Sequence, residues 1–267
     1  MDCASTTGGR LNSLANSLKD KRRSSMIAKN SKGTALLAMV AILLAVVGCG
    51  GGVRVGELRT ESEAVDLSGA TPVHVEIEMG AGELDVSGGA AKLLEADFAY
   101  NVAELKPIVE FSGSTLSVRT PDVRVRAASL LDLQDYRYKW VLRLNGNVPM
   151  DMQVSVGAGQ SDLQLGNLSL TRLDVGGGAG DVTVDLTGDW HNDLEATIEG
   201  GLGKRTLILP AGVGVRVKVE VGLGGVDATG LTKDGDYYVN DAYGQSDVTL
   251  NIQVNGGVGG TDLIVRE

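Results

Sequence analysis

The sequence is poor in the residues that build most catalytic and metal sites. It has two cysteines, Cys3 and Cys49, and two histidines, His74 and His191. Two cysteines so placed give no disulfide framework and no cysteine-based metal site. No HExxH or paired-histidine spacing occurs, and no serine or cysteine has a recognisable elbow or histidine partner. The sequence therefore predicts a protein that is not an enzyme and that binds no metal and no cofactor.

Aromatic residues are also scarce, at 4% of the chain, whereas glycine is abundant at 38 residues. Valine, leucine and isoleucine recur at alternating positions, which is typical of strands with one buried face. This composition indicates short strands joined by tight corners rather than a disordered chain.

A Gly-apolar-Gly triplet between two alternating segments occurs six times. Along the middle of the chain the first glycines are 21, 23 and 21 residues apart, which is typical of a stacked repeat. We expect the glycines to supply positive φ or close backbone approach at corners, and the apolar residue between them to point into the core. The predicted corner glycines are Gly80, Gly82, Gly157, Gly159, Gly178, Gly180, Gly201, Gly203, Gly222, Gly224, Gly257 and Gly259.

The predicted fold is mainly β, a single-stranded β-helix (β-solenoid) with Gly-x-Gly corners. An antiparallel β-sandwich, which also has short strands at regular intervals, is the alternative. Strands are expected at 73–79, 83–87, 92–101 and 140–144, with a hairpin at 108–111 and 115–118; a helix is the alternative at 92–101. The expected divisions are a leader and signal peptide (1–48), an anchor and tether (49–70), an N-terminal part (71–145) and the repeat array (146–267).

The N-terminal region predicts export. From Met26, two lysines precede an apolar run of about 15 residues, shorter than the ~20 that span a bilayer. The run ends in Val46-Val47-Gly48-Cys49, which resembles the lipobox of bacterial lipoproteins, where the cysteine carries a diacylglycerol. This implies lipidation at Cys49 and an exported protein anchored to the bacterial cell membrane, facing outside the cytoplasm. A single membrane helix is the alternative, and either Met1 or Met26 is the initiator.

Charge changes sign after this region. The first 49 residues hold 7 of the 24 Lys and Arg but 2 of the 34 Asp and Glu, so the remainder is strongly acidic. This balance argues against a nucleic-acid partner. A nucleotide site is also disfavoured, because each Gly-x-Gly is followed by strand alternation instead of a helix.

The last repeat interval contains an insertion at residues 230–246. Tyr237, Tyr238 and Tyr243 cluster there, and they either cap the open end of the stack or form a partner-binding surface. The acidic residues of the insertion do not match a calcium-loop spacing, which favours a solvated loop over a metal site.

Residues 71–267 resemble the toast-rack family of bacterial envelope proteins. The matching stretches are Val75 through Gly82 with Leu84, Trp140 through Leu144 with Pro149, and the array from Gly157 to Gly259. The family is related to the C-terminal domain of LiaF-type cell-wall-antibiotic-response proteins and to adhesin domains. The resemblance implies a β-helix with no assigned activity.

Together these observations predict a non-enzymatic cell-envelope lipoprotein that acts in binding, adhesion, scaffolding or stress sensing. The expected partners are the membrane, through the lipid, and an envelope protein or glycan. The alternative is an envelope glycan hydrolase or a carbohydrate-binding protein.

Overall fold

A computed structural model describes residues 55–67, 69, 71–123 and 135–267. Within these residues the chain is almost entirely β, with 17 strands in one sheet and a single 3-10 turn, η1 (Ala103–Leu105). The described part contains no helix with the length and hydrophobicity to cross a bilayer. The prediction of a mainly β fold is confirmed.

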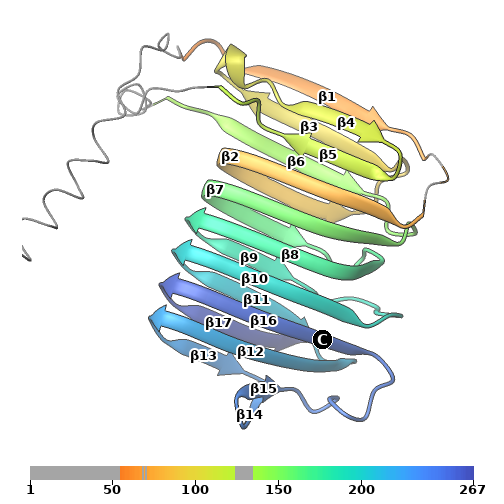
Figure 1. Ribbon diagram of the computed structural model, residues 1–267, viewed down its shortest axis with the longest axis vertical. Coiled ribbons are helices and arrows are strands. Elements are labelled where there is room, and N and C mark those ends of the chain that lie inside the picture. Colours follow the sequence, from red (N-terminus) through yellow and green to blue (C-terminus); the bar gives the residue numbers. More distant parts are fainter. Residues whose placement is uncertain (1–54, 68, 70, 124–134) are drawn as a thin grey trace, which may run out of the picture. The chain divides into compact units, whose positions relative to one another are not determined.

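The sheet is wound into stacked coils (Figure 1). Each coil has a front strand, a Gly-x-Gly corner and a back strand, and the front and back strands form two parallel rows. The corners lie along one edge of the stack, the corner edge, and the connections between coils lie along the opposite turn edge. The coils are β2 (Val73–Gly88), β7 (Met150–Gln164), β8 with β9 (Leu170–Ala179, Val182–Asp185), β10 with β11 (Leu194–Leu202, Arg205–Pro210), β12 with β13 (Gly214–Leu223, Val226–Thr229) and β16 with β17 (Thr249–Val258, Thr261–Arg266).

The core is a set of apolar ladders between the two rows. Alternate residues of every front strand point inward, as the sequence alternation predicts, and each contacts its counterpart in the next coil. One buried ladder consists of Val75, Met152, Leu173, Ala196, Ile252 and Val217. The parallel pairing of successive coils excludes the antiparallel sandwich that the strand spacing also allowed.

Strands outside the repeats cover the first coil: the two that adjoin β2 pair parallel with it, and the strands beyond them pair antiparallel. In the back row, β6 (Tyr138–Leu144) pairs with β2 and is followed by β3 (Leu94–Tyr100) and β1 (Arg59–Val65). In the front row, β5 (Thr115–Arg119) pairs with β2 and β4 (Ile108–Ser112), which confirms the predicted hairpin.

Strand β1 corrects the prediction that residues 49–70 form a tether throughout. Its alternation is hard to recognise because the half-buried side chains include glutamates, as is usual for a strand at a sheet edge. Glu61 accepts a hydrogen bond of 2.5 Å from the Tyr100 hydroxyl and pairs with Lys106. Polar contacts therefore replace apolar burial along this edge.

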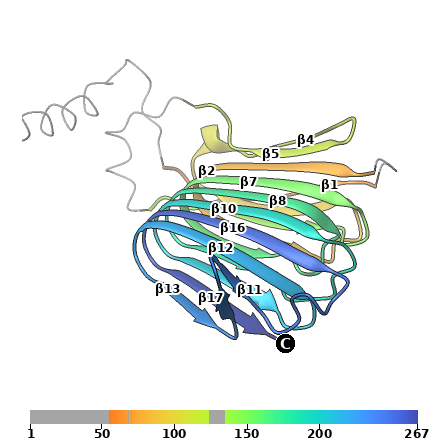
Figure 2. The same cartoon turned by 60° about the horizontal axis from the view of Figure 1, so that its bottom comes forward.

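The stacking order of the coils differs from their order in the sequence. Front strand β16 lies between β10 and β12, and back strand β17 lies between β11 and β13. Figure 2 shows the last coil of the chain inserted between two earlier ones. In the stack, the β16–β17 coil therefore lies between the β10–β11 coil and the β12–β13 coil, although β12 directly follows β11 in the sequence. The β12–β13 coil is the terminal coil of the stack.

A buried arginine accounts for this order. Arg205 is 2% exposed, and burial lowers its pKa. Its Nε donates to Thr261 Oγ1 at 3.2 Å, and one terminal nitrogen donates to the Gly259 carbonyl at 3.0 Å. The guanidinium needs the space at Gly256, because a Cβ there would lie 2.7 Å from Arg205 Cζ.

The β12–β13 coil cannot provide the same contacts. Val221 corresponds to Gly256 in the register of the front row, and Val226 corresponds to Thr261 in the back row. Packed against Arg205, the Val221 side chain would overlap the guanidinium, and Val226 would leave its Nε without an acceptor. Since an unpaired buried charge is costly, Arg205 selects the β16–β17 coil as its neighbour.

We predict that Thr261→Val lowers the free energy of unfolding by about 1–3 kcal/mol, because it leaves the Arg205 Nε–H buried without an acceptor. Thr206→Val, on the outer face of β11, is the matched control and should change stability by less than about 0.5 kcal/mol. Urea denaturation measures both. Equal stability of the two variants would contradict the selecting role of Arg205.

Candidate interaction surface

The tyrosine-rich insertion lies at the far end of the stack from β1. Its hairpin, β14 (Thr232–Asp234) with β15 (Tyr237–Val239), pairs antiparallel with the first part of β12. Tyr238 stands opposite the buried Val217, is half-buried and packs against the hydrophobic core. This tyrosine covers the open end of the core, as the capping alternative expects.

Tyr237 and Tyr243 instead bracket Arg216 on the outer face of β12. The Arg216 Cζ lies 4.7 Å from the Tyr237 ring centroid and 5.9 Å from that of Tyr243. One guanidinium nitrogen also donates to the Tyr243 hydroxyl at 3.3 Å. These three residues, the tip cluster, form a half-exposed cation–π arrangement in which both rings keep accessible surface.

Asn240 holds the insertion in place. It is buried, its side chain accepts from the Val215 N–H at 2.9 Å, and its amide donates to the carbonyls of Pro210 and Val213. Its side-chain groups are thus engaged by the backbone. Among the described residues no three His, Cys, Asp or Glu side chains are arranged to hold a metal.

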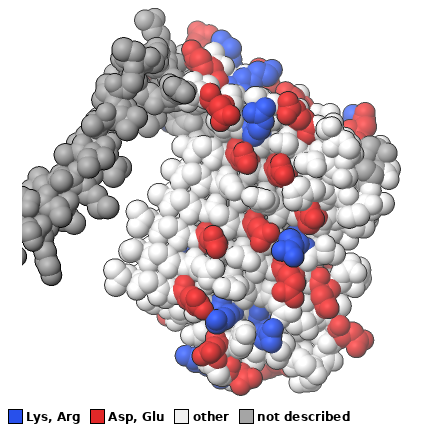
Figure 3. Space-filling model, in the orientation of Figure 1, with Lys and Arg blue, Asp and Glu red and all other residues white. Residues whose placement is uncertain are grey.

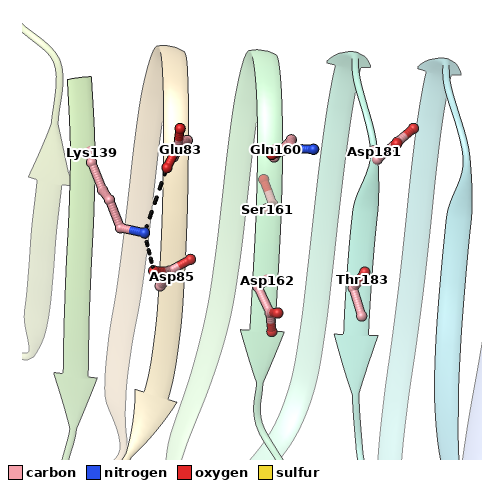
Figure 4. Close-up of a pocket in the computed structure, with 8 residues that line it drawn as sticks. All are labelled: Glu83, Asp85, Lys139, Gln160, Ser161, Asp162, Asp181 and Thr183. Atoms are coloured by element: carbon pink, nitrogen blue, oxygen red, sulfur yellow. Dashed lines mark ion pairs between the residues drawn. The ribbon is translucent and has the colours of Figure 1, made fainter. Parts of the chain in front are cut away.

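A polar pocket of about 270 Å³ opens on the outer face of the back row, over β2, β6, β7 and β9 (Figure 4). Lys139 Nζ lies 2.8 Å from an Asp85 oxygen and 3.5 Å from a Glu83 oxygen, so these two carboxylates share one ammonium group. Ser161 is buried, and its hydroxyl has no hydrogen-bond partner in the described structure. The lining residues include no histidine, so no imidazole stands beside this hydroxyl as in a Ser–His pair.

The two histidines lie apart from this pocket and from each other. His191 is exposed, next to the buried Trp190. His74, on the outer face of β2, pairs through Nδ1 with Asp151 of β7 and through Nε2 with Glu76 at 3.1 Å. The hydrogen bond to Asp151 raises the pKa of His74. His74 therefore joins two coils.

We predict that this contribution of His74 to stability depends on pH. Because its pKa is higher in the folded state, the contribution is complete below the unfolded pKa of about 6.5 and is lost as the pH rises through the raised folded value. The partners are partly exposed, so it should not exceed about 1 kcal/mol. Urea denaturation of the wild type and His74→Gln at pH about 5.5 and about 8.5 measures it. If the difference in unfolding free energy between the wild type and His74→Gln were larger at the higher pH, this would contradict the pairing of His74 with Asp151.

The corner glycines occupy their predicted positions, with two distinct roles. The second glycine of each corner has positive φ, for example +132° at Gly180. The first lies against the previous coil: a Cβ on Gly178 would overlap the carbonyl oxygen of Gly157. The residue between them does not point into the core, which corrects that expectation. Leu202, Val258 and Leu223 are 58%, 46% and 70% exposed.

The outward direction of these residues follows from the corner geometry. At a corner both flanking glycines pack against the next coil, so the middle side chain has only the outside of the bend available. The predicted lipidation site, Cys49, lies outside the described residues.

Comparison with known proteins identifies the fold. A family model for the N-terminal domain of toast_rack (DUF2154) matches residues 54–208, more than half of the chain. The chain belongs to the toast_rack family. No curated protein was found to match this toast_rack chain.

Solved structures include similar chains. A "putative cell adhesion protein" from Clostridium sporogenes is 30% identical with a TM-score of 0.75, and the match covers 79% of this chain and 100% of that one. A "putative adhesin" from Bacteroides fragilis is 14% identical with a TM-score of 0.30, over 80% of this chain and 100% of that one. The Clostridium protein therefore shares the toast_rack fold over its whole length.

Proposed function

We propose that this toast_rack protein is a non-enzymatic adhesion or binding module of the cell envelope, tethered to the membrane by a lipid on Cys49. The similarity over the full length of the Clostridium cell adhesion protein is the observation that carries the proposal. The lipobox-like sequence before the described residues supports the tether and an extracytoplasmic location.

The tip cluster is the proposed contact with the partner. It lies on the terminal coil, at the opposite end of the stack from β1, where the chain enters the fold (Figure 1). Aromatic rings with accessible faces next to an arginine are frequent in binding hot spots. A tether at one end and aromatic side chains at the other would present the cluster to the surroundings.

An envelope glycan is the partner that we favour. The flat outer face of the neighbouring β16 carries Asn251, Gln253 and Asn255, which provide amide donors and acceptors beside the tip cluster. Asn251 Nδ2 already donates to Glu195 at 2.9 Å, so the amides are held in position. Rings that stack on sugar faces and fixed amides that bond hydroxyls suit a glycan better than a highly charged partner.

The anchor has a direct test. The N-terminus of the protein purified from membranes should begin at Cys49 and carry the mass of a diacylglycerol, because two acyl chains suffice for stable anchoring. Mass spectrometry of the N-terminal peptide measures this. An unmodified N-terminus upstream of Cys49 would contradict the anchor and favour a membrane helix.

The tip cluster is tested by co-sedimentation of the purified protein with isolated cell-wall polysaccharide. We predict that Tyr237→Ala/Tyr243→Ala weakens binding on the order of tenfold or more, because each lost ring stack is a hot-spot contact. Tyr237→Phe/Tyr243→Phe keeps the rings and should bind almost as well as the wild type.

Two outcomes would contradict this assignment. If Tyr237→Ala/Tyr243→Ala bound the polysaccharide as well as the wild type, the insertion would only cap the end of the core and would not contact the partner. Release of reducing ends from the polysaccharide by the wild-type protein would instead show hydrolysis and end the non-enzymatic proposal.

A further inference from the structure

Large exposed apolar side chains gather on one edge of the stack. In register, the residues between the corner glycines run Ala81, Ala158, Ala179, Leu202, Val258 and Leu223. The last three, which we call the apolar ridge, are neighbours in space although they are distant in sequence, because β16 lies between β10 and β12. The coil order thus produces a continuous apolar strip that the sequence does not show.

The ridge residues have few charged neighbours along the chain, and the nearby carboxylates Asp181, Asp227 and Asp262 gather around Lys204. Within two residues of Leu202, Val258 and Leu223 the one ionisable side chain is Lys204, which pairs with Asp262 at 2.6 Å. Figure 3 shows this on the left of the described surface, where charged side chains are sparse compared with the front face.

The ridge backbone is also suited to a water-poor environment. The carbonyl of Leu202 accepts from Gly180 N at 2.7 Å, that of Val258 from Gly203 N at 3.0 Å, and that of Leu223 from Gly259 N at 2.8 Å. A polar group that is already hydrogen-bonded costs far less to remove from water than an unpaired one. Burying the ridge would therefore gain apolar contact without leaving these carbonyls unpaired.

The described chain begins on the same edge. Arg59 is in register with Tyr100 and Tyr138, and the Tyr138 carbonyl lies against the corner glycine Gly82. Just before it, Val55 and Leu58 are 36% and 59% exposed. Cys49 precedes Val55 by six residues, at most about 20 Å of chain. A lipid on Cys49 would hold this edge close to the bilayer.

We propose that the corner edge lies against the lipid surface, with the apolar ridge inserted among the headgroups. This inference rests on the proposed anchor and adds a second membrane contact, at the far end of the stack. The occupant is a lipid surface rather than a protein, because the tether keeps the entry end of this same edge next to the bilayer and the ridge is a convex strip instead of a groove. Leu67, 53% exposed at the turn edge beside Val148 and Pro149, stays in water.

The test uses the mature lipidated protein, whose one native cysteine, Cys49, carries the lipid, with one dye on an introduced cysteine, in phosphatidylcholine vesicles that contain a doxyl quencher. Dye at Leu202→Cys or Leu223→Cys should be quenched, and dye at Leu67→Cys, the matched control, should not. A second experiment places the dye at Val258→Cys and compares the chain with and without the double substitution Leu202→Ser/Leu223→Ser. The substitution should reduce the fraction of molecules whose ridge contacts the lipid, measured by quenching, by about tenfold or more, because two exposed leucines no longer gain apolar burial. Leu67→Ser should leave the quenching unchanged.

Flotation of the same samples separates the two proposals. If the protein floats with the vesicles but positions 202 and 223 are quenched no more than 67, the anchor stands and the ridge inference is wrong. If the protein does not float, the anchor fails and the inference fails with it. A blue shift at position 202 that needs no lipid and disappears on dilution would show that a second copy covers the ridge, which also overturns the inference.

Discussion

Close approach between glycine corners sets the distance between neighbouring coils. In every corner except the first, at Gly80, a Cβ on the first glycine would overlap the carbonyl oxygen of the equivalent glycine in the adjacent coil. This contact repeats from Gly80 through Gly157, Gly178, Gly201 and Gly257 to Gly222. It keeps the coils at the spacing of a hydrogen-bonded sheet where the chain bends most sharply. The apolar ladders of the two rows can pack only because the corners allow this spacing.

The same corner geometry makes the coils nearly interchangeable, so the backbone alone does not determine their order. Parallel strands with similar apolar alternation could pair in several arrangements. Arg205 removes this ambiguity, because it requires a residue without a side chain at one position of the next coil and a hydroxyl at another. Gly256 and Thr261 meet both requirements, whereas Val221 and Val226 meet neither. One polar residue in the core thus specifies the stack in the way that a single buried polar side chain specifies coiled-coil register.

The sequence predicts the structural features that recur in every coil, but it does not predict features that depend on a single contact. The Gly-x-Gly period and the strand alternation were sufficient for the fold class, the corners and the β4–β5 hairpin. The position of the β16–β17 coil was not predictable, since it depends on the contact between Arg205 and a residue 56 positions later. The outward direction of Leu202 is not predictable from its apolar character, because the packing of both flanking glycines leaves its side chain only the outside of the bend.

The candidate site was recognised in part. The clustering of Tyr237, Tyr238 and Tyr243 in the sequence pointed to the insertion, but capping and binding were treated as alternatives for all three. The structure separates them: Tyr238 packs on the core, and the other two enclose Arg216. Arg216 itself had no signal in the sequence, because it is one of several polar residues that alternate with valines in its strand.

Leu223 and Arg216 belong to the same strand, β12, and this relates the two proposed contacts. Arg216 is near the start of the strand, toward the turn edge, and Leu223 is its last residue, at the corner edge. A corner edge placed on the bilayer would therefore direct the tip cluster away from it. The middle residues of the corners are alanines near the entry of the chain and become large only in the last three coils. A tether alone leaves the far end of a rigid stack free to rotate, so apolar side chains are most useful at that end, where they would fix the orientation of the cluster relative to the membrane.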